Sequence, residues 1–121
     1  MDAVLSVHGR VGYALVLYYT AVGIWGLALW LRRAGPSANF RGAIAIAVIA
    51  SAAQGALGLA VTLFGAPPRD PLHLLYGVAL VAAMPLGASL VGRWNPPRQA
   101  LGLGLAALFT AGLAIRGIIT A

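Results

Sequence analysis

Cysteine, glutamate and lysine are all absent from this chain of 121 residues, and aspartate occurs only as Asp2 and Asp70. The absence of cysteine excludes a disulfide framework, a thiolate metal site and a cysteine nucleophile. No carboxylate lies in the middle of a long apolar run, where a proton-coupled transporter would need one. The sequence also has no nucleophile–base pair, phosphate-binding loop or metal-hydrolysis motif, so an independent enzyme is not expected.

Apolar residues make up 61% of the chain and charged residues only 8%. Soluble domains are about 45–50% apolar and about 25% charged, so this composition predicts a chain surrounded by lipid. The net charge of +6 comes from eight arginines that stand between apolar runs and form no patch or stripe. Nucleic acid is therefore not an expected partner.

Four apolar runs are long enough to span a bilayer as helices, which takes about 20 residues each. The short connections between them contain proline and glycine, which end helices. We therefore predict an all-α protein with a single integral membrane domain, residues 1–121, folded as an up-down four-helix bundle. The predicted helices cover residues 5–31, 42–64, 72–91 and 100–117.

The arginines are distributed unequally between the two ends of the predicted bundle. The first and third connections carry five of them, whereas the other end carries three, offset by Asp2 and Asp70. Because cytoplasmic loops are enriched in basic residues, we predict a protein of the bacterial cytoplasmic (inner) membrane with both termini outside. The N-terminal run lacks a basic segment and a cleavage site, so we expect it to be retained. The five arginines are Arg32, Arg33, Arg41, Arg93 and Arg98, and the three are Arg10, Arg69 and Arg116.

The two histidines of the chain, His8 and His73, have similar surroundings. In "SVHGRVGYALVL" and "PLHLLYGVALVA" alike, a glycine follows the histidine by four residues and a long apolar run continues from there. The runs from His8 to Arg32 and from His73 to Arg93 measure roughly 36 and 30 Å as helices, so both histidines lie near the outer ends of parallel helices. Alternate helices are diagonal in a four-helix bundle, so the two imidazoles can face each other across its axis.

Two histidines that face each other in this way suit the axial positions of a haem iron. A residue four positions along a helix lies on the same face, so Gly12 and Gly77 would make room for a porphyrin edge. We therefore expect one b-type haem. Its iron ligands would be His8 and His73, its other contacts Gly12, Gly77, Gln54 and the propionate-pairing Arg10 and Arg69, and its further candidate neighbours Tyr13 and Tyr76.

Other interpretations of these residues stay open. A histidine can lie at the wet membrane boundary without a ligand, and glycine is common where membrane helices pack closely. A chlorophyll magnesium would need only one histidine. A lone metal ion would find only two ligands, with no carboxylate or thiolate placed to complete the site. Gln54 could contact a haem or a quinone, or form an interhelical hydrogen bond.

Aligning His8 with His73 reveals a weak internal repeat. Each half of the chain has a histidine, an apolar helix, a connection containing arginine and proline, and a returning helix rich in glycine and alanine. Two halves in the same orientation predict two helical hairpins related in parallel, with a pseudo-twofold axis along the membrane normal.

Two stretches of the chain resemble the haem A synthase family. "VHGRVGYALVL" is similar to the start of the family's first histidine-bearing helix, and "AQGALGLAVTLFGAPPRDPLHLLYGVAL" to its QGxLGxxTV…P…HL stretch. The resemblance covers nearly the whole chain, as one half of those two-bundle proteins, and implies that His8 and His73 form a haem ligand pair. The second stretch matches at Gln54, Gly55, Leu57, Gly58, Val61, Thr62, Pro71, His73 and Leu74.

The chain also departs from that family. Leu5 takes the place of the family's catalytic glutamate, and Arg10 follows the histidine by two residues rather than directly. The resemblance therefore implies a bundle that binds a b-type haem and passes electrons, without the oxidising chemistry.

These observations lead to two hypotheses about function. The first is a membrane b-haem electron-transfer protein, a subunit of a larger redox complex or a homodimer, with a quinone as a candidate partner. The second is a cofactor-free or chlorophyll-binding accessory subunit of a respiratory or photosynthetic membrane complex. Membrane lipid is an expected partner in both.

Overall fold

The computed structural model describes all 121 residues and contains four helices and no strands. Each helix is long and apolar enough to cross a membrane. The chain is therefore all-α, and its helices suggest a multi-pass membrane protein. The helices are α1 (Asp2–Leu31), α2 (Ala38–Phe64), α3 (Leu72–Val91) and α4 (Pro96–Thr120).

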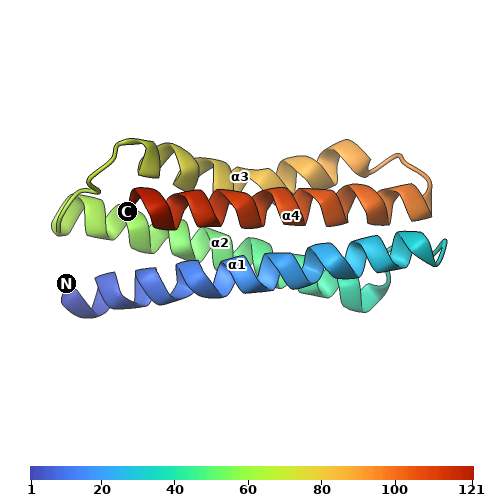
Figure 1. Ribbon diagram of the computed structural model, residues 1–121, viewed down its shortest axis with the longest axis horizontal. Helices are drawn as coiled ribbons and strands as arrows, with labels where there is room; N and C mark the ends of the chain where they lie inside the picture. The colour runs from blue at the N-terminus through green and yellow to red at the C-terminus, as the bar shows by residue number, and fades with distance from the viewer.

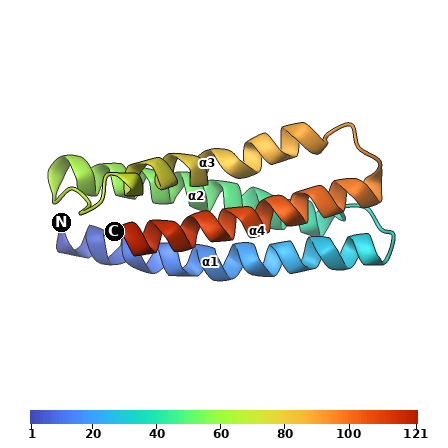
Figure 2. The ribbon, with the colours of Figure 1, turned by 45° about the horizontal axis from the view of Figure 1, so that its top comes forward.

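The four helices lie side by side (Figure 1). The backbones of α1 and α3 each approach α2 and α4 closely but do not approach each other, so these two helices are diagonal across the molecule. Both termini and the α2–α3 connection lie at one end, which we call the terminal end (Figures 1 and 2). The α1–α2 and α3–α4 connections lie at the other end, which we call the far end. The starts of α1 and α3, which carry the histidines, are both at the terminal end.

Three helices extend beyond their predicted bounds, whereas α3 begins and ends at the predicted residues. α1 begins at Asp2 rather than residue 5, α2 begins at Ala38 rather than residue 42, and α4 spans Pro96–Thr120 rather than residues 100–117. The starts of α2 and α4 differ from the prediction because hydropathy marks the apolar part of a helix, whereas a polar cap marks its start; α1 has no side-chain cap. Ser37 and Asn95 supply these caps by accepting hydrogen bonds from the backbone N–H groups of residues 40 and 98, at 3.1 and 3.2 Å.

α1 and α4 are in close backbone contact where three glycines meet. A Cβ atom on Gly26 would lie 2.7 Å from the Cα of Gly104 and 2.9 Å from the carbonyl oxygen of Ala100. A Cβ atom on Gly104 would lie 3.0 Å from the carbonyl oxygen of Gly23. Small residues allow such close backbone approach between membrane helices. The contact therefore depends on the absence of side chains at these positions.

Tyrosine hydroxyls connect α1 to α2. Tyr18 donates a hydrogen bond to the carbonyl oxygen of Ala43 at 2.8 Å, and Tyr19 donates one to that of Ala47 at 3.2 Å. The Tyr19 hydroxyl, which is fully buried, also shares a hydrogen bond with the Ser51 hydroxyl. Polar groups away from water need such partners, so these bonds fix the two helices relative to each other.

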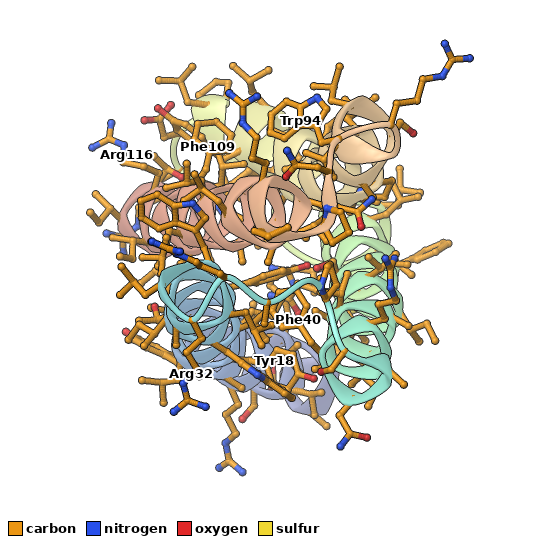
Figure 3. All side chains as sticks on the ribbon, turned by 90° about the vertical axis from the view of Figure 1, so that its right-hand side faces the viewer. Tyr18, Arg32, Phe40, Trp94, Phe109 and Arg116 are labelled. Atoms are coloured by element: carbon orange, nitrogen blue, oxygen red, sulfur yellow. The ribbon has the colours of Figure 1, made fainter.

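The outer surface of the molecule is largely apolar. Only 22 of 121 residues are buried, and large side chains such as Leu17, Phe64 and Leu90 are more than 70% exposed. A contiguous apolar surface of this kind is typical of contact with lipid or with another protein. Viewed from the far end, Phe40 points between the helices, whereas Arg32 and Arg116 lie at the periphery (Figure 3).

We expect Gly26→Ala to lower the free energy of unfolding by about 1–3 kcal/mol, because its Cβ atom would meet the backbone of α4 rather than a movable side chain. Reversible unfolding in mixed detergent micelles, followed by circular dichroism, measures this. Gly112→Ala is the matched control, because no atom lies within 4 Å of a Cβ atom added there. Equal destabilisation by both substitutions would contradict a specific α1–α4 contact.

Candidate functional site

The two histidines meet at the terminal end. His8 lies near the start of α1 and His73 near the start of α3, and the centroids of their rings are 6.0 Å apart. The ring planes are nearly perpendicular, at 77°. Residues 65 positions apart in the sequence are therefore neighbours, because the two diagonal helices present them at the same height.

Both imidazoles line a cavity of about 500 Å³ that is bordered by all four helices. This volume falls within the range of roughly 300–1,000 Å³ that is usual for cofactor and ligand sites. The wall is mostly aliphatic side chains and glycine, and it contains no carboxylate. The lining glycines are Gly9, Gly12, Gly55, Gly58, Gly77 and Gly117.

Glycines keep the cavity open beside the histidines. A Cβ atom on Gly77 would have no atom within 4 Å, so this position borders empty space. A Cβ atom on Gly58 would lie 2.9 Å from Cε1 of His8, so only glycine lets that imidazole rest against α2. The α2–α3 interface, where Gly58 and Gly77 lie, is also the sparsest of the four helix interfaces.

A backbone carbonyl holds the imidazole of His73. Its Nδ1 lies 2.7 Å from the carbonyl oxygen of Gly117 in α4. A carbonyl oxygen can only accept, so Nδ1 carries the proton and Nε2 keeps a free lone pair. Histidines that ligate metals have this arrangement, with one nitrogen on the metal and the other donating to a carbonyl or carboxylate.

Gln54 in α2 reaches across to the other histidine. It is buried, and its Nε2 donates a hydrogen bond to the backbone carbonyl oxygen of His8 at 2.8 Å. A Cβ atom on Gly12 would lie 3.3 Å from this Nε2, so the glycine leaves room for the amide. Nδ1 of His8 and Oε1 of Gln54 are the two buried side-chain polar atoms that lack a hydrogen-bond partner.

The predicted contact residues divide into two groups. Arg10 and Arg69 are exposed and do not line the cavity, and Tyr13 is 63% exposed. Arg10 follows His8 by two residues, which turns it about 200° around the helix, away from the imidazole. Arg69 belongs to the α2–α3 connection. The residues that the structure brings together around the cavity are His8, His73, Gly12, Gly77, Gln54 and Tyr76.

Sequence reasoning missed part of the site. It used Arg116 only as one of the charges at one end of the bundle, whereas the Arg116 guanidinium lies 5.5 Å from the ring centroid of Tyr76, which lines the cavity. Gly58 could have been found as the residue one turn after Gln54 on the same helix face. No sequence signal identifies the contact of Gly117, because it is made by a backbone oxygen.

The donor set constrains the kind of metal group that these residues could hold. No three histidine or acidic side chains are grouped closely enough to bind a metal ion. A bare ion would thus have at most two protein ligands, His8 and His73, whereas a metal that brings most of its own ligands would need only two from the protein. Comparisons of the chain with protein-family models, curated proteins and solved structures found no match. The functional argument therefore depends on the geometry of the site.

We expect His73 to carry its proton on Nδ1, because the Gly117 carbonyl oxygen can only accept. Nitrogen-15 spectra of the detergent-solubilised protein labelled with ¹⁵N-histidine measure the tautomer. The chain has only two histidines, so the His73→Ala variant assigns the signals. A proton on Nε2 of His73 would contradict the arrangement described.

Proposed function

We propose that this protein is a membrane b-type haem-binding electron-transfer protein. In this proposal the chain is an up-down four-helix bundle, and His8 and His73 ligate one haem iron at the terminal end. The observation that carries the proposal is the pair of neighbouring imidazoles that line one apolar cavity, one of them with its Nε2 lone pair free.

The two imidazoles are close enough for both to hold one metal group. Their ring centroids are 6.0 Å apart, and both rings line the cavity. Gly77 leaves space beside them that a flat cofactor could use, since no atom lies within 4 Å of a Cβ atom added there.

The residues of the chain have distinct roles in this proposal. His8 and His73 hold the iron, and the Gly117 carbonyl oxygen keeps Nε2 of His73 free to bind. The aliphatic wall excludes water, which together with the axial ligands sets the reduction potential. A bound haem supplies one-electron redox chemistry at its iron. No acidic side chain lines the cavity, so the wall offers no carboxylate as a general base.

Arg116 and Tyr76 form the polar edge of the proposed site. Arg116 stacks over the ring of Tyr76, and its neighbour in sequence, Gly117, is bonded to His73. A guanidinium in this position suits the carboxylate groups at the edge of a haem. We therefore assign to Arg116 the propionate contact that the sequence had suggested for Arg10 and Arg69.

The proposed setting is the bacterial cytoplasmic membrane, with the protein as a subunit of a larger redox complex or as a homodimer. Five arginines belong to the far end, whereas Asp2 and Asp70 belong to the terminal end. The positive-inside rule therefore supports a cytoplasmic far end and a haem near the outer face. A quinone in the membrane or a redox protein outside it could exchange electrons there.

We expect the detergent-purified protein, expressed with ample haem, to bind about one haem per chain with two axial histidines. A reduced-minus-oxidised visible spectrum should show the sharp band of a low-spin b-type haem. His73→Ala and His8→Ala should each abolish this low-spin band, because neither has another histidine to replace it.

Tyr13→Phe is the control for these spectra, because Tyr13 is exposed and lies outside the cavity. Unchanged haem content in both histidine variants would rule out ligation by the pair. A flat spectrum from folded wild-type protein would favour a cofactor-free accessory subunit instead. Chlorophyll absorption in its parent complex would favour the chlorophyll-binding alternative.

We expect both termini to lie outside the cytoplasm. The chain has no cysteine, so a single cysteine introduced at a chosen position reports its own accessibility. A membrane-impermeant maleimide added to intact spheroplasts should label Ala121→Cys, at the terminal end, and should not label Ala34→Cys, at the far end. The opposite labelling pattern would reverse the proposed topology.

A further inference from the structure

Two neighbouring residues, His8 and Gln54, each have one buried polar atom without a hydrogen-bond partner. Nδ1 of His8 and Oε1 of Gln54 both lack a partner, although Nε2 of Gln54 is bonded to the backbone of His8. Unpaired buried polar groups are costly and rare in native proteins. We propose that Gln54 is the positioning residue of His8, with Oε1 accepting the Nδ1 proton so that Nε2 is presented to the cavity.

The hydrogen-bonding capacities of the two residues support this assignment. The carbonyl oxygen of His8 can only accept, so the amide atom facing it at 2.8 Å must be the donor Nε2. Oε1 is then an acceptor without a donor. A neutral histidine that ligates through Nε2 carries its proton on Nδ1 and needs an acceptor there. Gln54 is more than nine-tenths buried, so water does not readily take this role.

Two glycines, one in each helix, leave the room that lets the Gln54 amide and the His8 imidazole lie together. Gly12 lies one turn after His8 in α1 and leaves room for the Gln54 amide, since a Cβ atom there would lie 3.3 Å from Nε2. Gly58 lies one turn after Gln54 in α2 and leaves room for the imidazole, since a Cβ atom there would lie 2.9 Å from Cε1. These positions therefore bring the amide and the ring together.

The Nδ1 protons of the two histidines would then be accepted by different kinds of group. A backbone carbonyl holds His73, and no substitution removes it, whereas a replaceable side-chain amide would hold His8. For its effect on the cofactor this inference rests on the proposed haem function. Partners of metal-bound histidines typically contribute about 10–100-fold to metal affinity. Gln54 would therefore tune the affinity and the potential of the haem from the His8 side.

The tautomer of His8 tests the contact without any haem. In ¹⁵N-histidine-labelled apoprotein, we expect the His8 proton on Nδ1 in the wild type and a loss of this preference in Gln54→Met, which keeps the chain length but removes the acceptor. Gln54→Glu should keep the proton on Nδ1, because a carboxyl group accepts in either protonation state. If Gln54→Met does not fold, a neutral wild-type His8 with its proton on Nε2 overturns the inference by itself.

Tyr18→Phe is the matched control, because it removes another α1–α2 hydrogen bond without touching His8. It should leave the tautomer and the haem affinity unchanged, whereas Gln54→Met should raise the dissociation constant for haem about 10–100-fold. An identical His8 tautomer in the wild type and Gln54→Met would overturn the inference even if haem binds. If the tautomers follow Gln54 but the wild type binds no haem, the haem proposal fails and the Gln54–His8 contact stands.

Discussion

The close contact between α1 and α4 is the constraint on which the rest of the structure depends. Gly26 and Gly104 allow two backbones to meet where any side chain would separate them. In lipid, helix association depends on such packing and on interhelical hydrogen bonds rather than on the hydrophobic effect. This contact lies toward the far end of α1, and the tyrosines hold α2 against the same helix. The bundle is therefore firmly packed on the α1 side.

Glycine has the opposite effect near the terminal end. At Gly77 the missing side chain leaves space that no neighbouring atom fills, and at Gly58 it admits the imidazole of His8. The same residue type closes one interface and opens a cavity at another, because the separation of the helices differs between the two places. Backbone carbonyl oxygens hold two of the polar side chains that enter this apolar cavity, since that of Gly117 holds His73 and that of His8 holds Gln54.

The proposed function follows from how little chemistry the cavity wall contains. Two imidazoles and one amide are its main polar side chains, and no carboxylate is present. Such a wall could hold a metal cofactor and shield it from water, and apart from the two imidazoles and the Tyr76 hydroxyl it contains no side chain that could act as an acid, base or nucleophile. Electron transfer requires only that the protein hold the cofactor and shield it from water, so it is the activity that we propose for this arrangement.

The sequence by itself determined the four helices, the bounds of α3 and the matched histidines, because hydropathy and residue spacing depend only on local order in the chain. It did not determine which side chains reach the cavity. Arg10 points away from it, whereas Arg116 lies at its edge on Tyr76. Only the tertiary structure decided these contacts, together with the Gly117 carbonyl bond, because they depend on how each helix is rotated about its own axis. That rotation is set by packing against helices that are distant in the sequence.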